Sequence, residues 1–404
     1  MSGRPLERNL RLYGWVKVFG KRVYLPLTTI YLVEVGHLTL AQIGSLVTIA
    51  AITAIASDIP TGYYADRVKR KTAIVIGALL LSLASLIYVL FPMFVGAMAA
   101  VIIEAFGFSF ISGAGEALMH DTLVAMGAVN RYVKVMGRAQ SFGLMGNVIL
   151  VGVIPLTYGI NKRLPFIAGV IAALVLALCA SSLVEPHRVK PAHLSGNVYA
   201  GLVRSLRTFI SRHSIWIFIA IGTLSAFYVI YGNFVNLVYK DLGMNVSLIG
   251  LIYSAASIVG AVGGYFVHHA RRIPLLAYAL FDVFMACSTM ILIGLTRNLW
   301  VAITMGLLNL GFWRLRSIIY QDNLLRIFGS GGSKATLISA LNFFDDVNEI
   351  WLPIVFVSAT TSLGFYSGFI LLGTGASVII GILFIIGVTA LTRYQKPTSK
   401  TLAA

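Results

Sequence analysis

Charge is scarce in this sequence, and negative charge is the scarcest. Only 11% of the 404 residues are charged, and 14 Asp and Glu stand against 31 Lys and Arg. Hydrophobic residues make up 58% of the chain, and its mean hydropathy is +0.88. A water-soluble protein of this length could not cover so much apolar surface. This excludes a soluble globular fold and indicates a chain that crosses a membrane several times.

Several signatures of chemistry are missing as well. The two cysteines, Cys179 and Cys287, both lie in apolar runs, so no disulfide framework is implied. No Gly-x-x-x-x-Gly-Lys-[Ser/Thr] and no His-Glu-x-x-His occurs, and all seven histidines fall in loops or at the ends of apolar runs. We therefore expect no ATP motor, no bound metal, no cofactor and no enzyme. An intramembrane enzyme would need a nucleophile–base pair or metal ligands at depth.

Long apolar runs are what the sequence does have. They are continuous rather than alternating, so helices and not a membrane barrel are the spanning elements. The expected fold is an all-α polytopic membrane protein with twelve transmembrane helices in two six-helix pseudo-repeats. The predicted spans are about 14–36, 41–61, 72–90, 92–114, 136–158, 164–184, 214–236, 247–267, 273–295, 299–320, 335–358 and 364–391.

The basic residues divide unevenly between the two ends of these spans. One face receives 24 of the 31 Lys and Arg, including Arg314, Arg316 and Arg326, and the other receives four. This division predicts a multi-pass protein of the cell (plasma or inner) membrane with both termini in the cytoplasm. The charge of +17 is then explained by topology. We expect membrane lipids as partners and no nucleic acid.

The two halves of the chain repeat each other. The stretch 62–70 aligns with 264–272 at an offset of 202, and 121–123 aligns with 322–324 at an offset of 201. The polar stretch between spans six and seven separates the halves. It predicts an N-terminal half at 1–184, a cytoplasmic linker with an amphipathic surface helix at 185–213, and a C-terminal half at 214–404.

The turn between the second and third spans carries the most specific motif. Its sequence resembles Gly-x-x-x-Asp-Arg-x-Gly-Arg-Lys, the signature of the major facilitator superfamily. The residues that match are Gly62, Asp66, Arg67, Arg70 and Lys71, while Lys69 replaces the second glycine. The stretch 112–123 is similar to the end of the fourth helix in a little-characterised prokaryotic branch of that superfamily.

The resemblance implies two halves that rock about a substrate site at mid-membrane. It also implies a conformational latch on the cytoplasmic side. There Asp66 faces the helix that begins near Lys334, and Arg67 or Arg70 pairs with Asp121 or Glu116. Gly62 belongs to the same motif. The alternative is an ordinary loop that is basic only because it is cytoplasmic.

The eleventh span contains an unusual group of polar residues. Asn342, Asp345, Asp346 and Glu349 follow the spacing i, i+3, i+4, i+7, so they share one face of a helix near the midplane. Carboxylates are costly there, and three together hold at least one proton tightly. This favours a proton carrier or a cation site. The alternative is a set of acids neutralised by fixed basic partners.

Other candidate residues lie in the first and fourth spans. A polar stripe in the first span consists of Lys17, Lys21, Tyr24, Thr28 and Tyr31. Lys21 and Arg22 are expected either to pair with an acid of the eleventh span or to attract an anionic group of the substrate, and Tyr31 to line the cavity. Glu104, alone in the fourth span, is a candidate for coupling or substrate binding, against a buried structural role.

These observations predict a secondary active transporter that moves a small organic solute by alternating access. Proton-coupled export of amphiphilic or cationic compounds is the first hypothesis. Proton-coupled uptake, or facilitated diffusion of a small polar solute or cation, is the alternative. A receptor that kept the fold without transporting is a third. Protons are the expected coupling ion, and we expect a monomer.

Overall fold

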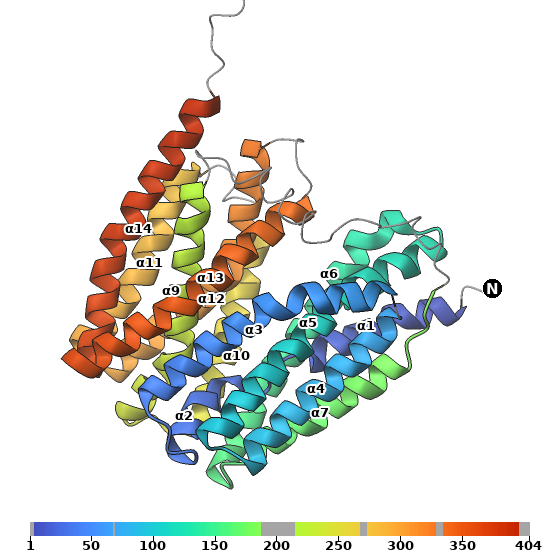
Figure 1. Cartoon of the computed structure of the whole chain (residues 1–404), viewed down its shortest axis with the longest axis horizontal. Coiled ribbons are helices and arrows are strands. Elements are labelled where there is room, and N and C mark those ends of the chain that lie inside the picture. Colours follow the sequence, from blue (N-terminus) through green and yellow to red (C-terminus); the bar gives the residue numbers. More distant parts are fainter. Residues whose placement is uncertain (1–3, 68, 187–214, 267–272, 329–333, 396–404) are drawn as a thin grey trace, which may run out of the picture. The chain divides into compact units, whose positions relative to one another are not determined.

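The computed structural model consists of helices joined by short turns throughout the residues that it describes, which are 4–67, 69–186, 215–266, 273–328 and 334–395 (Figure 1). The helices in order are α1 (Arg4–Phe19), η1 (Leu25–Leu27), α2 (Thr28–Glu34), α3 (Leu40–Arg67), α4 (Arg70–Leu90), α5 (Phe94–Ala125), η2 (Val129–Arg131), α6 (Tyr132–Val153), η3 (Ile154–Gly159), α7 (Leu164–Ser181), α9 (Ile215–Asp241), η4 (Val246–Leu248), α10 (Ile249–Phe266), α11 (Leu275–Thr296), α12 (Leu299–Phe328), α13 (Lys334–Leu363) and α14 (Phe365–Gln395).

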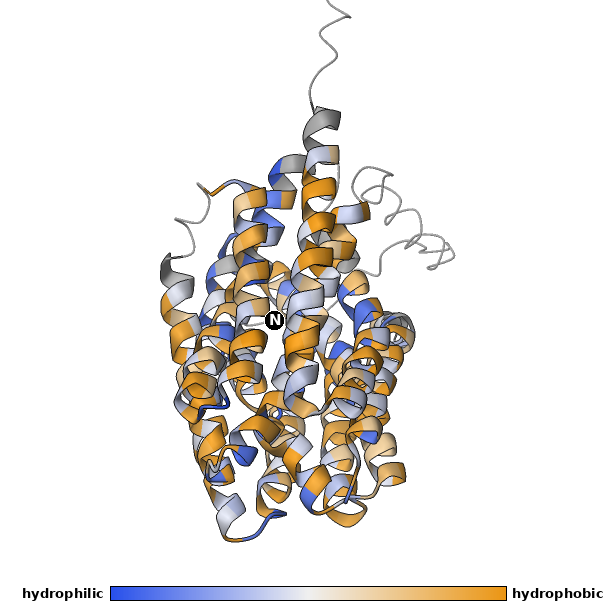
Figure 2. Ribbon diagram, turned by 90° about the vertical axis from the view of Figure 1, so that its left-hand side faces the viewer, coloured by the Kyte–Doolittle hydropathy of each residue, from blue (hydrophilic) through white to orange (hydrophobic). Residues whose placement is uncertain are grey.

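Nine of these helical segments, among the described residues, are long and apolar enough to cross a membrane, and two shorter apolar helices accompany them. Hydrophobic residues run along most helices, while many of the strongly hydrophilic residues lie at turns and helix ends (Figure 2). Each of the twelve predicted spans has a helical counterpart. The predicted all-α membrane fold is therefore confirmed.

The first span differs from its prediction. A single helix over 14–36 was expected, but the chain leaves the helix after Phe19 and resumes it only at Leu25. The polar stripe from Lys17 to Tyr31 therefore does not lie on one continuous helix face. Pro26 at the start of η1 accounts for part of this, because proline cannot supply the N–H that a continuous helix requires.

The chain forms two compact units by its internal contacts. Unit 1 comprises 1–194 and 233–258, and unit 2 comprises 195–232 and 259–404. In unit 1, α4 packs against α5 and α7, and α1 packs against α6 and α7 (Figure 1). In unit 2, α11 packs against α14 and α12. The boundaries of the predicted halves and of the linker stay predictions, and the predicted surface helix lies outside the described residues.

Glycines allow close helix contacts in unit 1. A Cβ atom on Gly77 of α4 would lie 2.7 Å from the carbonyl oxygen of Gly107 on α5. On α6, a Cβ on Gly143 or Gly146 would meet Lys17 or Val18 of α1 at 2.7 Å and 2.6 Å. Small residues at such crossings let two membrane helices approach until their backbones touch.

Candidate functional site: two buried arginine–carboxylate clusters

Glu104 is the centre of a polar cluster in unit 1. Its carboxylate is buried in α5, and Arg22 Nη1 lies 3.2 Å from its Oε2. The hydroxyl of Tyr24 donates to Oε1 at 2.9 Å and in turn accepts from Ser85 of α4 at 3.1 Å. We call Arg22, Tyr24, Ser85 and Glu104 the Arg22 cluster. Both carboxylate oxygens are therefore bonded, as a buried charge requires.

The Arg22 cluster changes the expected pairing of the first span. Arg22 was a candidate partner for an acid of the eleventh span, whereas its partner is Glu104 on α5. The Arg22 side chain is 40% exposed and that of Glu104 only 5%, so Arg22 reaches from accessible space to a buried acid. Lys21, beside it, is also exposed. A solute that reached Arg22 would therefore meet a cation backed by a buried acid.

Tyr31 lies elsewhere. It is fully buried, and its hydroxyl donates to the backbone carbonyl of Tyr88 at 2.9 Å. Its ring centroid is 4.1 Å from that of Phe166. These contacts pack α2 into the core of unit 1. They do not present the Tyr31 hydroxyl to a cavity.

A second cluster occupies the core of unit 2. Arg316 of α12 is 3% exposed and donates through Nε to Asp282 Oδ2 at 3.1 Å. Tyr228 donates to Asp282 Oδ1 at 2.7 Å, and Tyr320 donates to Oδ2 at 2.9 Å. Arg316 also donates to the Ser225 hydroxyl. We call Ser225, Tyr228, Asp282, Arg316 and Tyr320 the Arg316 cluster.

Each nitrogen of the Arg316 guanidinium donates a hydrogen bond. Its Nη2 donates to the carbonyl oxygen of Ile221 at 3.2 Å. Its Cζ lies 5.2 to 5.4 Å from the ring centroids of Tyr228, Trp313 and Tyr320. Cation–π contacts and hydrogen bonds from all three nitrogens together make a buried guanidinium tolerable. The cluster joins α9, α11 and α12 in one unit.

Arg316 corrects the charge count made from the sequence. It was counted among the cytoplasmic residues, but its burial removes it from that face, which leaves 23 against four. The sequence held a signal for this partner. Asp282 stands in an apolar span, where an acid needs a counter-charge, and Arg316 lies inside the predicted span 299–320.

The polar residues of the eleventh span lie on α13, which is continuous from Lys334 to Leu363. Ser225 of the Arg316 cluster also hydrogen-bonds Asp345. The Oδ1 atom of Asp345 is buried and has no hydrogen-bond partner among the residues that the structure describes. Asn342 is exposed, and Asp346 and Glu349 are half-buried. Among these four residues, the described contacts connect Asp345 to the Arg316 cluster.

Sequence reasoning passed over Asn348, which is buried beside these acids. It accepts from Thr223 of α9 at 2.9 Å and from the indole of Trp351 at 3.2 Å, and it donates to the carbonyl of Phe344 at 2.7 Å. At the same crossing, a Cβ on Gly222 would lie 2.5 Å from that carbonyl oxygen. These contacts fix α13 against α9 and so position Asp345.

The signature turn contributes a third arrangement, in unit 1. Arg70 Nη1 lies 2.7 Å from Asp121 Oδ2, and Asp121 is one of the two acids that the resemblance offered as its partner. Glu116, the other, lies 3.9 Å from Lys17 and is mostly exposed. Gly62 is exposed in α3. The side chains of Asp66 and Arg67, and the proposed contact with the start of α13, lie outside the described residues.

Glu185 completes this arrangement, and the sequence analysis did not single it out. Its two carboxylate oxygens accept from the backbone N–H groups of Arg70 and Lys71, each at 2.9 Å. These are unpaired donors at the first turn of α4, so the carboxylate caps the helix and complements its dipole. The fully buried Asn9 donates to the Thr122 hydroxyl and to the Val184 carbonyl, and it accepts from the Val184 N–H. Thr122 and Val184 are the chain neighbours of Asp121 and Glu185.

Unit 1 contains a fourth cluster, which is centred on Glu34. Glu34 accepts from Lys162 at 2.8 Å, from Lys240 at 2.7 Å and from the Tyr158 hydroxyl at 2.8 Å. We call Glu34, Tyr158, Lys162 and Lys240 the Glu34 cluster. It ties α2 to η3 and to the C-terminal end of α9, all within unit 1.

A family profile described as Major Facilitator Superfamily matches residues 12–347. The chain belongs to the Major Facilitator Superfamily. No curated relative matches the sequence. Similar solved structures include the nucleoside transporter NupG, at 15% identity and a TM-score of 0.75, over 98% of this chain and 100% of that one.

Two further structures extend the comparison. A POT family transporter in complex with 5-aminolevulinic acid has 14% identity and a TM-score of 0.74, over 96% of both chains. A bacterial homolog of the human lysosomal transporter Spinster, inward-facing and unoccupied, has 15% identity and a TM-score of 0.67, over 97% of this chain and 95% of that one. At these identities the likeness is one of fold. Together with the family, it identifies a multi-pass membrane protein that is a secondary transporter.

Proposed function

We propose that the protein couples the movement of a small organic solute to the movement of protons, with Asp345 as the proton-carrying acid. The observation that supports this is the environment of Asp345. One of its carboxylate oxygens is buried without a hydrogen-bond partner among the described residues. Asp345 also forms a hydrogen bond with Ser225 of the Arg316 cluster. A buried carboxylate that is incompletely bonded is costly when ionised and is relieved by a proton.

The Arg316 cluster supplies the second requirement for coupling, which is a fixed ion pair near an acid that changes its charge. Asp282 neutralises Arg316 permanently, because two tyrosines and the guanidinium bind its oxygens. Asp345 shares Ser225 with Arg316. Proton loss from Asp345 would therefore add a negative charge beside an existing ion pair and alter the packing of α13 against α9.

Glu104 and Arg22 are the proposed contact with the solute. Arg22 is accessible, and Glu104 holds it from the buried side. Our first hypothesis for the solute remains an amphiphilic or cationic compound that is exported. Both termini are proposed to lie in the cytoplasm of a cell membrane.

One observation favours the alternative, which is proton-coupled uptake or facilitated diffusion of a small polar solute. The exposed cations Lys21 and Arg22 suit a solute with an anionic group. The similar structures named above include a nucleoside transporter and a POT family transporter bound to an amino acid, and both handle polar solutes. These similarities establish the fold alone. They therefore decide only which solutes are tested first.

Proteoliposomes with a pH dye inside test the proposal. Lipophilic cations, nucleosides, peptides and amino acids are added in turn, and proton movement and solute movement are recorded for the wild type. Asp345→Asn is expected to remove solute-dependent proton movement. The matched control is Asp322→Asn, which removes an acid from an exposed pair with Arg326. It should change neither proton movement nor solute movement. Solute movement without proton movement in the wild type would overturn the coupling.

A further inference from the structure

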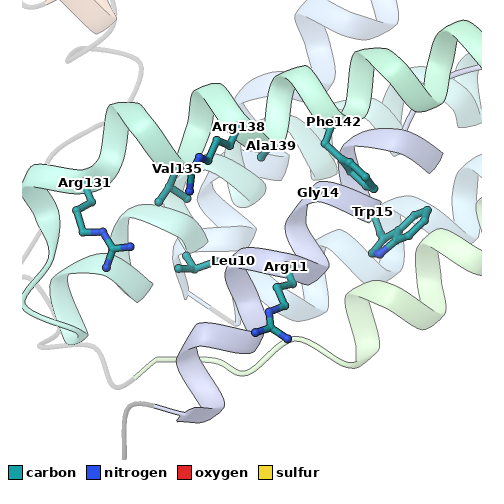
Figure 3. A pocket seen from close by; sticks show the side chains of 9 residues that line it. All are labelled: Leu10, Arg11, Gly14, Trp15, Arg131, Val135, Arg138, Ala139 and Phe142. Atoms are coloured by element: carbon teal, nitrogen blue, oxygen red, sulfur yellow. The ribbon is translucent and has the colours of Figure 1, made fainter.

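A cavity of about 400 Å³ lies between α1 and α6 in unit 1, and none of its lining residues belongs to the Arg22 cluster (Figure 3). Its lining residues are Leu10, Arg11, Gly14, Trp15, Arg131, Val135, Arg138, Ala139 and Phe142. We call this cavity the α1–α6 groove. No residue of the proposed transport mechanism lines it, so it requires an explanation of its own.

The α1–α6 groove is basic at one end and apolar at the other. On α6 and the turn before it, Arg131, Val135, Arg138 and Phe142 recur at spacings of four, three and four, which places them on one helix face (Figure 3). At about 1.5 Å per residue, Arg131 and Phe142 are roughly 16 Å apart along the axis. This length spans the depth from a lipid phosphate into the acyl region.

The apolar end is built from two exposed aromatic rings. Trp15 is 45% exposed and Phe142 is 42% exposed. Their ring centroids are 5.0 Å apart with an interplanar angle of 89°. A Cβ on Gly14 would lie 3.0 Å from Phe142 Cδ1, so the glycine leaves room for that ring. Tryptophan at a membrane boundary is typical of the level where headgroups meet acyl chains.

The basic end of the groove has three arginines. Arg11, Arg131 and Arg138 are exposed, and none of them forms an ion pair among the residues that the structure describes. Arg131 also stands at the N-cap of α6, where the helix dipole adds positive potential. Three guanidinium groups around one opening match a phosphate ester, because guanidinium binds phosphate through paired N–H donors.

We infer that the α1–α6 groove is a binding site for an anionic phospholipid, with the phosphate among the arginines and an acyl chain along Trp15 and Phe142. The apolar end favours a lipid over free phosphate, which would leave both rings uncovered. The inference rests on the proposed cytoplasmic position of this end, where anionic lipids are abundant. It does not depend on the proposed solute or on proton coupling.

Quenching of Trp15 fluorescence tests the site in the full-length protein. The protein is reconstituted in phosphatidylcholine vesicles that contain a few per cent of phosphatidylglycerol with brominated acyl chains. Trp15→Phe, measured in parallel, gives the contribution of the other four of the five tryptophans, which is subtracted. Brominated phosphatidylcholine in the same amount reports contact with any surrounding lipid. Inorganic phosphate is added in a separate series.

The wild type is expected to prefer brominated phosphatidylglycerol to brominated phosphatidylcholine. At about 1 kcal/mol per arginine, Arg131→Gln with Arg138→Gln should weaken that preference by roughly thirtyfold. Arg138→Gln alone should weaken it by about fivefold, which serves if the double variant does not fold. The matched control removes two exposed charges on the same helices, Arg8→Gln with Lys134→Gln, and should leave the preference intact.

Two outcomes would overturn the inference. Equal quenching by both brominated lipids would mean that Trp15 meets only the general lipid surroundings. Displacement of brominated phosphatidylglycerol by millimolar inorganic phosphate would mean that the arginines hold a free anion. Neither outcome would bear on the proton movement tested in proteoliposomes, so the two proposals fail separately.

Discussion

Tyr24 and Tyr228 lie 204 residues apart in the chain, and each donates its hydroxyl to a buried carboxylate that is paired with an arginine. The Tyr24 hydroxyl is 2.9 Å from Glu104 Oε1, and the Tyr228 hydroxyl is 2.7 Å from Asp282 Oδ1. The separation of 204 is close to the offsets of 201 and 202 at which the two halves of the sequence repeat. The repeated feature is thus a tyrosine in the first predicted span of each half.

The helices that carry the charges are not repeated. In unit 1 the arginine precedes Tyr24 by two residues and the acid is on α5, whereas in unit 2 the acid is on α11 and the arginine on α12. Arg22 is 40% exposed and Arg316 is 3% exposed. The arginine of the first pair is therefore accessible, and the second pair is part of the core.

Breaking the second pair should cost far more than replacing both of its members. Arg316→Gln leaves Asp282 as an uncompensated charge in the core, so we expect a loss of about 3–5 kcal/mol in stability. Asp282→Asn combined with Arg316→Gln should be less damaging than Arg316→Gln alone. Thermal unfolding in lipid nanodiscs measures both, with the exposed Arg326→Gln as the control, expected within 1 kcal/mol of the wild type. Additive losses in the double variant would contradict a direct pair.

The cap on α4 gives a local prediction. Glu185→Gln has one acceptor oxygen where the carboxylate has two, so one of the N–H groups of Arg70 and Lys71 loses its partner. We expect a cost of about 1 kcal/mol and faster hydrogen exchange at the first turn of α4. Asp121→Asn is the control, because it removes the ionic partner of Arg70 but leaves both backbone bonds. Equal acceleration in the two variants would show that the cap is not what protects this turn.

The expectations from sequence were most accurate where hydropathy decides the structure. Spans of about 20 apolar residues read directly as helices, because lipid leaves no other partner for the backbone. Side-chain pairing was harder, since it depends on which faces meet. Glu104 was singled out without its partner Arg22, because the sequence gives depth along each helix but not the rotation of its neighbours.

The break in the first span shows a second limit. No charged residue interrupts the stretch from Val23 to Val33, so hydropathy alone predicts one helix there. Gly20 and Pro26 flank the segment that is not helical, and together they were a signal for the break. The interruption matters for the proposed function, because Arg22 of the Arg22 cluster lies within it.

The Glu34 cluster predicts a change in local opening. Glu34→Gln removes the anion that Lys162 and Lys240 share, and it leaves those two cations near each other. We expect hydrogen exchange in α2 to become about tenfold faster, which corresponds to about 1.4 kcal/mol. Lys162→Gln leaves Lys240 and Tyr158 bound to Glu34 and should have a smaller effect. An effect of Lys162→Gln as large as that of Glu34→Gln would contradict the central role of the carboxylate.

The crossing of α4 and α5 gives the last prediction, which concerns packing alone. A Cβ on Gly77 would lie 2.7 Å from the carbonyl oxygen of Gly107 and 2.7 Å from Ile111 Cγ1, and backbone cannot move aside as a flexible side chain can. Gly77→Ala should therefore force the two helices apart and cost about 1–3 kcal/mol. Gly375→Ala on α14 is the matched control, because nothing described lies within 4 Å of its Cβ position. It should be neutral or slightly stabilising, since alanine favours a helix more than glycine does. Thermal unfolding in nanodiscs separates the two variants, and equal melting temperatures would mean that α4 and α5 do not meet at these glycines.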